Sequence, residues 1–84
     1  MTVPPLDQIV SALRGYIEPT LLAGRPVGDE EDLLLSGLLD SLAVMSLVAF
    51  VEERFALKVP FDDVLIENFE SISALAAYVE GRMR

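Results

Sequence analysis

The chain of 84 residues contains no cysteine and no histidine. Without cysteine, the chain can form no disulfide, no thiolate nucleophile and no zinc-finger site. Without histidine it lacks the commonest general base and the commonest metal ligand, so a Ser-His-Asp triad cannot be assembled. These absences predict a protein that is not a self-sufficient enzyme and that holds no metal.

Basic residues are scarce as well: six lysines and arginines stand against fourteen acidic residues, a net charge of -8. Such a chain repels phosphate backbones, which argues against a nucleic-acid partner, and it suits contacts with basic protein surfaces. Plain solubility explains the same charge equally well. The longest apolar run, residues 42–51, is too short to span a bilayer, and the N-terminus lacks the features of a signal peptide. We therefore expect a cytoplasmic protein without a membrane partner.

What the sequence does contain is a pattern of helices. No useful stretch alternates apolar and polar residues as a half-buried strand would. The first helix is predicted after Pro4-Pro5, because residues 6–21 place apolar side chains at three- and four-residue steps. Pro19 predicts an irregularity or an end near Glu18, since proline disfavours helical geometry in the residue before it.

Three further segments complete the predicted architecture. A second helix is expected over residues 41–55 and a short third helix within residues 61–66, with residues 67–70 leading into a last helix capped by Ser71. The length suffices for one small domain and not for two. We therefore predict an all-α fold with residues 1–84 in a single domain. Its form is a small four-helix bundle of three main helices and a short third one, with a long loop between the first two.

The predicted loop spans residues 23–40 and contains several turn formers. A loop of this length in a small domain is usually functional or well anchored. Its leucines are too apolar for a free linker, and we expect them to pack into the bundle: Leu33, Leu34, Leu35, Leu38 and Leu39. The acidic run 29–32 is expected to be a solvated patch, because it lacks the alternating oxygen ligands and the glycine of a calcium loop.

The second helix carries two apolar stripes. At about 100° per residue, Val44 and the apolar residues at 47, 48, 51 and 55 share the face that is expected to line the core. A second face is formed by Leu42, Met45 and Ala49, with Glu52 and Glu53 at its edges. A helix buried on two sides would explain this pattern. An exposed apolar patch rimmed by carboxylates, which is typical of a docking surface, would explain it too.

The strongest local feature lies where the loop meets this helix. The Asp40 side chain is suited to cap the helix by accepting a free N–H of the first turn. Ser41 then lies at the positive end of the helix dipole, where an attached anion would find favourable potential. Taken alone, an aspartate and a serine before an apolar run indicate no more than a good helix cap.

The segment around this cap resembles the attachment motif of the acyl and peptidyl carrier proteins. In that family a serine that follows an aspartate carries 4′-phosphopantetheine. The matching residues here are Asp40, Ser41 and Leu42, approached through Gly37-Leu38-Leu39. The likeness continues at residues 51–55, at Val59-Pro60 and at residues 68–72. It covers the chain from the first helix to about Glu80.

The resemblance implies a carrier without catalytic residues of its own. Ser41 would anchor the covalent 4′-phosphopantetheine taken from coenzyme A, with Asp40 beside it, and the arm would supply the thiol that the chain lacks. Ser41 has no base nearby in the sequence, so a separate phosphopantetheinyl transferase would activate its hydroxyl. Further partners would be an acyl- or aminoacyl-loading ligase or transferase and downstream synthase enzymes.

Carriers of this family present their second helix to their enzymes. Carried over by position, the partner-binding residues are Leu42, Met45, Ala49, Glu52, Glu53 and Val64, the last in the short third helix. The chain departs from typical fatty-acid carriers, which often have carboxylates where Ala43 and Ser46 stand. Docking should then depend more on Leu42 and Met45 than on ion pairs.

This departure favours a dedicated carrier from a specialised pathway of polyketide or nonribosomal-peptide type, with a carrier for fatty-acid synthesis as an alternative. Because the chain starts at Met1 and ends soon after the last helix, we expect a discrete protein that acts in trans as a monomer. An alternative of a different class is a helical interaction module without a prosthetic group, whose second stripe binds a partner helix.

Overall fold

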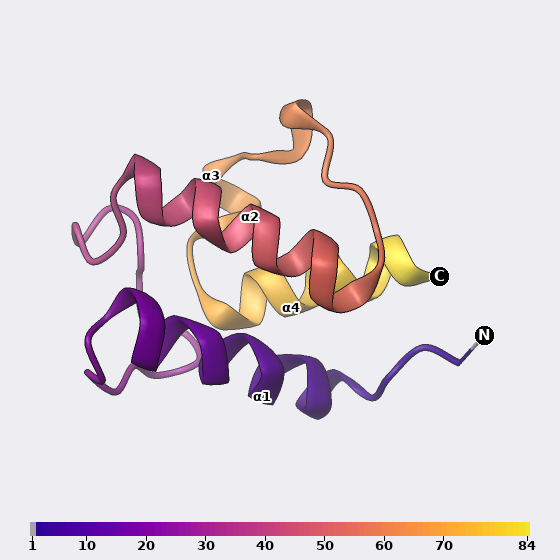
Figure 1. Ribbon diagram of the computed structural model, residues 1–84, viewed down its shortest axis with the longest axis horizontal. Helices are drawn as coiled ribbons and strands as arrows, with labels where there is room; N and C mark the ends of the chain where they lie inside the picture. Colours follow the sequence, from indigo (N-terminus) through magenta and orange to yellow (C-terminus); the bar gives the residue numbers. More distant parts are fainter. Residues whose placement is uncertain (1) are drawn as a thin grey trace.

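The computed structural model describes residues 2–84, and within that range every regular element is helical. The all-α prediction is confirmed: three long helices and one short helix form the fold, with a long connection between the first two (Figure 1). α4 packs against α1, α2 and α3 and is therefore the common neighbour of the other helices. The α-helices are α1 (Leu6–Tyr16), α2 (Ser41–Phe55), α3 (Ile66–Phe69) and α4 (Ile72–Met83). No helix within residues 2–84 combines the length and the apolar character needed to cross a membrane.

The irregularity predicted at Pro19 takes the form of a π-helical turn, η1 (Ile17–Leu21), that continues α1. Proline has no N–H to donate to the preceding turn, so the regular ladder of hydrogen bonds cannot continue through it. The wider turn restores the pairing further on, where the N–H of Leu22 donates to the Ile17 carbonyl at 3.0 Å. The helical path therefore extends beyond Glu18 instead of ending there.

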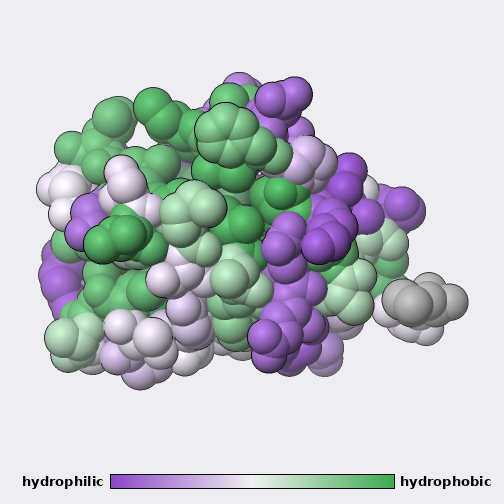
Figure 2. All heavy atoms as spheres, turned by 45° about the horizontal axis from the view of Figure 1, so that its top comes forward, coloured by the Kyte–Doolittle hydropathy of each residue, from purple (hydrophilic) through white to green (hydrophobic). Residues whose placement is uncertain are grey.

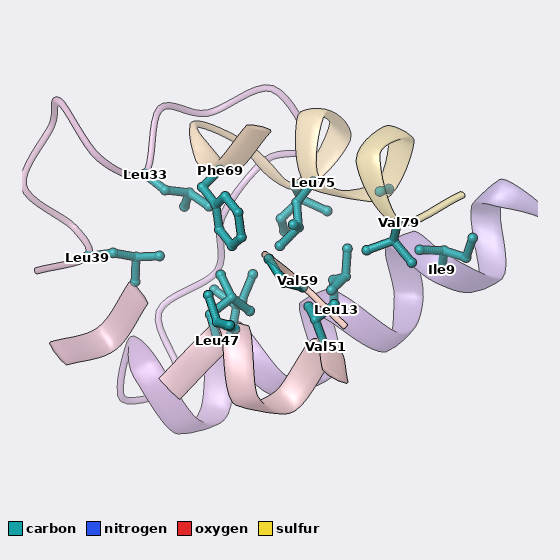
Figure 3. Close-up of a cluster of buried hydrophobic side chains, with 14 of the residues drawn as sticks. Ile9, Leu13, Leu33, Leu39, Leu47, Val51, Val59, Phe69, Leu75 and Val79 are labelled. Atoms are coloured by element: carbon teal, nitrogen blue, oxygen red, sulfur yellow. The ribbon is translucent and has the colours of Figure 1, made fainter. Parts of the chain in front are cut away.

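The buried side chains of every helix converge on one core, which Figure 3 shows in part. Leu13 of α1, Val51 of α2, Phe69 of α3 and Leu75 of α4 point into it, and none of them is more than 1% exposed. The predicted cap of α4 is confirmed, because the Ser71 hydroxyl oxygen accepts the N–H of Ala74 at 3.1 Å. This packed core provides the rigid support on which α2 is held.

The long connection is anchored to the core, but not through every leucine. Leu33 and Leu39 are buried, Leu34 and Leu38 are half-buried, and Leu35 is 76% exposed, so the expectation for Leu35 was wrong. The N–H of Leu33 donates to the Glu70 carbonyl at 2.7 Å, which ties the connection to the end of α3. The turn that follows directs Leu35 away from the core, a direction that composition alone does not reveal.

The acidic run 29–32 is more than a solvated patch. Three of its four carboxylates fasten the connection, because the chain turns sharply there and leaves backbone N–H groups that need acceptors. The contacts join Arg14 with Asp29, Arg25 and the Gly28 N–H with Glu31, and the N–H groups of Leu34 and Leu35 with Asp32. The run is exposed or half-buried, in keeping with a solvated patch, but the sequence pattern did not reveal these contacts.

The predicted third helix is displaced along the chain. Residues 61–63 form a single 3-10 turn, η2 (Phe61–Asp63), whereas α3 begins only at Ile66 and includes three residues that were expected to lead into the last helix. The physical reason is Phe69, which is 1% exposed: the short helix forms where it can deliver this large side chain to the core. Val64 consequently lies between the two turns and not in a helix.

A hydrogen bond between α4 and this segment predicts a loss of stability in strong alkali. The Tyr78 hydroxyl donates to the Asp63 carboxylate at 2.6 Å. Burial, the larger cause, and this hydrogen bond together raise the pKa of Tyr78 to about 12. An unfolded tyrosine titrates near pH 10, so the folded state holds its proton more tightly. The stabilisation should be complete below about pH 10 and disappear as the pH rises towards about 12.

Urea denaturation between pH 9 and pH 11.5 measures this effect. We expect Tyr78→Phe to flatten the decline in the free energy of unfolding over this range. Parallel curves for wild type and Tyr78→Phe would contradict the assignment.

Candidate functional site

The candidate site begins with the residue that caps α2. Asp40 is in an extended conformation, and its carboxylate accepts the N–H of Ala43 at 2.8 Å, as the sequence predicted. Its backbone carbonyl accepts the N–H of Val44 at 2.9 Å, which starts the helical ladder. Buried Leu39 anchors the chain immediately before the cap. The start of α2 is thus fixed by buried Leu39 before the helix and by the Asp40 hydrogen bonds in its first turn.

Gly37 allows the chain to reach this cap. Its φ of +81° lies in the left-handed region that residues with a Cβ rarely adopt. The turn that it completes is closed by its own N–H, which donates to the Leu34 carbonyl at 3.1 Å. This local geometry explains why a glycine stands in the approach to Ser41.

Ser41 is the first residue of α2, and its side chain is exposed to solvent. Within residues 2–84, the structure shows no side chain hydrogen-bonded to its hydroxyl. A serine hydroxyl is a weak nucleophile unless an adjacent base takes its proton. The chain therefore presents the hydroxyl to solvent, with no base beside it among the described residues.

The backbone beside Ser41 fits a phosphate group. The cap and the first helical bond engage the N–H groups of Ala43 and Val44, whereas those of Ser41 and Leu42 have no acceptor among the described residues. The positive end of the helix dipole lies at the same place. A phosphodiester on the Ser41 oxygen would find N–H donors and favourable potential there.

An open groove of about 290 Å³ lies next to Ser41. Its apolar wall combines side chains from three parts of the chain: Leu34, Leu39, Val44, Met45 and Val64. Sequence analysis assigned Val44 to the core and the loop leucines to packing, and it missed that these residues line the surroundings of Ser41. The only sequence signal was the unusual density of leucine in a long loop.

The second apolar stripe of α2 is exposed, so the alternative of a helix buried on two sides is wrong. Leu42 is 79% exposed, Met45 is 55% exposed, and Ala49 and Glu53 also face solvent. The structure thus brings these predicted partner-binding residues together on one side of α2.

Two of the predicted partner-binding residues are placed differently from the expectation. Glu52 is half-buried, and its carboxylate accepts the N–H of Val59 at 2.8 Å, so it holds the chain that leaves α2. Val64 lies outside any helix and is half-buried beside the Ser41 groove. The sequence pattern placed Glu52 at the edge of the second face of α2 and Val64 in the short third helix, but it did not reveal these contacts.

Removal of the cap is expected to weaken α2. Asp40→Ala deletes the acceptor of the Ala43 N–H and should lower the free energy of unfolding by about 1 kcal/mol. Asp40→Asn keeps a side-chain oxygen at the same place and is the matched control, with little change expected. Urea denaturation monitored by circular dichroism measures both. Equal losses for the two variants would show that the carboxylate charge matters more than the hydrogen bond.

Comparison with known proteins agrees with this geometry. Residues 11–79 match a family described as "Phosphopantetheine attachment site". The chain is also 30% identical over 74 residues to a protein of Kineococcus radiotolerans that is named "Acyl carrier protein". That alignment covers 88% of this chain and 82% of the relative. The family match includes the cap, Ser41 and all of α2.

Proposed function

Because the chain belongs to the phosphopantetheine attachment family, whose members are non-catalytic carriers, we propose that Ser41 bears the 4′-phosphopantetheine arm. The observation that supports this choice is the exposed hydroxyl at the start of α2, next to free N–H groups and an apolar groove. When bound, the arm supplies a thiol that holds acyl or aminoacyl groups as thioesters. The chain, which has no cysteine, supplies the attachment point and its surroundings.

Attachment requires an enzyme from outside the chain. In the proposed step, the Ser41 oxygen forms a bond to the phosphorus of coenzyme A that carries pantetheine. The bond from this phosphorus to the bridging oxygen breaks, and adenosine 3′,5′-bisphosphate leaves. The serine proton passes to a base of the phosphopantetheinyl transferase, because no base of this chain contacts the hydroxyl among residues 2–84.

The surroundings of Ser41 have separate tasks in this proposal. Asp40 keeps the first turn of α2 in place, so that the N–H groups of Ser41 and Leu42 face the new phosphodiester. The groove walls, which include Met45 and Val64, offer apolar contact to the part of the arm nearest the protein. These residues bind and orient, and none of them transfers a proton.

The exposed stripe of α2 is proposed as the surface that enzymes contact. Leu42, Met45 and Ala49 supply the apolar centre, Glu53 faces solvent at its edge, and Val64 lies beside it. Glu52 is expected to contribute less to this surface, because its carboxylate already accepts the Val59 N–H. Loading enzymes and synthases with an apolar patch and basic edges would fit it.

The pathway is proposed from the charges of α2. Its first turns carry no acidic residue after Asp40, which supports a dedicated carrier in a polyketide or nonribosomal-peptide type of synthesis over a fatty-acid carrier. We further propose that residues 1–84 act as a single domain and as a cytoplasmic monomer, since a net charge of -8 opposes self-association. Mass spectrometry of the arm on protein isolated from its host would identify the carried group.

Incubation with coenzyme A and a promiscuous phosphopantetheinyl transferase tests the proposed function. We expect the intact mass to increase by one phosphopantetheine, and fragmentation of the modified peptide should locate the increase at Ser41. A helical interaction module without a prosthetic group would show no change in mass. Modification at another residue would reject Ser41 as the attachment site.

A further inference from the structure

A second exposed apolar patch lies outside α2, on the segment that connects α2 to α4. We call it the Phe61 patch and define it by Phe61, Leu65 and Ile66. Phe61 is 84% exposed and is the most exposed large apolar side chain among the described residues. The other two are about half exposed. Sequence analysis did not single out any of the three.

The Phe61 turn is held in place although its aromatic ring faces solvent. The N–H of Asp63 donates to the Pro60 carbonyl at 2.9 Å, and the N–H of Val64 donates to the Phe61 carbonyl at 3.0 Å. Asp63 is fastened twice more: its carboxylate accepts the Tyr78 hydroxyl, and its carbonyl accepts the Asn68 side chain at 2.9 Å. A ring presented on an ordered turn loses little entropy on binding, which favours a role as an interface anchor.

The patch is close to the Ser41 groove along the chain. Val64 lines the Ser41 groove, and Phe61 is three positions earlier, at most about 11 Å of extended chain away. In Figure 1 the turn that carries Phe61 lies on one side of α2, and α1 lies on the other side. Figure 2, which brings the first of these sides forward, shows apolar residues gathered toward the N-terminal end of α2 and hydrophilic residues gathered at the opposite end.

One partner must come close to Ser41 itself. The transferase has to bring its active site within bonding distance of the Ser41 oxygen itself, whereas later enzymes meet the far end of the arm. A standard interface buries about 800 Å² on each partner, which corresponds to a contact about 30 Å across. Such an interface, centred on the Ser41 groove, extends about 15 Å in each direction, and Phe61 is within about 11 Å of chain from Val64 in the groove wall, so we expect it to include Phe61. A second copy of the chain is a poor occupant, because each copy has a net charge of -8.

We propose that Phe61 anchors the phosphopantetheinyl transferase, with its ring in an apolar pocket of that enzyme. Exposed Asp62 follows Phe61 in the sequence and exposed Glu67 follows Ile66, so basic side chains are expected at the border of the pocket. This inference rests on the proposed function, because it assumes that a transferase modifies Ser41. It adds an anchor outside α2 and identifies the enzyme that uses it.

Steady-state kinetics of modification by a phosphopantetheinyl transferase of the host provide the test. Phe61→Ser should raise KM for the carrier at least about tenfold and leave kcat nearly unchanged, since it removes binding energy and not a reacting group. Phe61→Tyr keeps an aromatic anchor and should stay close to wild type. Leu6→Ser, which changes a half-exposed apolar residue on α1, is the matched control and should leave KM unchanged.

The outcomes separate this inference from the function on which it rests. A wild-type KM in Phe61→Ser overturns the anchor and leaves the carrier function intact. An equal rise of KM in Leu6→Ser also overturns it, because the effect would then not be specific to the Phe61 patch. A wild-type chain that accepts no phosphopantetheine overturns both. Thermal melts should show that all three variants remain folded, since each changes an exposed side chain.

Discussion

Ser41→Ala is expected to abolish modification by coenzyme A and transferase completely. Alanine offers no oxygen to phosphorus, and the structure provides no second hydroxyl at the start of α2. The folded state should survive, because Ser41 is exposed, the Asp40 cap remains, and alanine is a good helix former. Intact mass spectrometry after overnight incubation would then show only the unmodified chain.

Ser46→Ala is the matched control for this experiment. Ser46 is also exposed on α2, but it lies inside the helix, where the N–H groups are engaged in the helical ladder. We expect it to gain one phosphopantetheine as the wild type does. Residual modification of Ser41→Ala would show that another hydroxyl accepts the arm. Loss of modification in both variants would instead indicate that the α2 surface, and not the acceptor atom, limits the reaction.

Leu33→Ala should cause the largest loss of stability among the substitutions considered for the long connection. Leu33 is 0% exposed and contacts the core, so the substitution removes buried methyl groups and leaves a cavity, at a cost of about 2–5 kcal/mol. A chain of 84 residues has a total stability of about 4–13 kcal/mol, so this loss is a large part of it. Urea denaturation measures the change directly.

Leu35→Ala serves as the control, since it makes the same chemical change in the same connection. Leu35 is 76% exposed, and its truncation should change the free energy of unfolding by no more than about 0.5 kcal/mol. The backbone carbonyl of Leu33 accepts the N–H of Leu39, a bond that alanine at position 33 keeps, so the expected loss comes from the side chain. Equal effects of the two substitutions would contradict the anchoring of the connection through Leu33.

The parts of this protein that follow from local chemistry could be predicted from its sequence. The bounds of α2, the Asp40 and Ser71 caps and the disturbance at Pro19 each depend on residues only a few positions apart. Hydrogen bonds within one turn and the lack of an N–H on proline act over that range. The position of Ser41 at the start of a helix, and the resemblance to carrier proteins around it, could also be read from neighbouring residues in the sequence.

The features that sequence reasoning missed depend on contacts between distant segments. Two leucines only two positions apart in the long connection between α1 and α2 differ in exposure: Leu33 is buried and Leu35 is exposed. The backbone of Leu33 is hydrogen-bonded to the end of α3, whereas Leu35 lies on the turn that follows and points away from the core. Glu52 is less available to the predicted docking surface, because its carboxylate accepts the N–H of Val59 from the segment that follows α2. The periodicity of apolar residues along the chain does not reveal which distant segments are in contact.

The sequence by itself therefore determined the helices, their caps and the position of the candidate attachment serine. Only the tertiary structure decided which apolar residues surround that serine and that Phe61 is left in solvent on a fixed turn. The physical reason is that helix formation is governed by near neighbours along the chain. Exposure depends instead on which surfaces the packed helices leave uncovered.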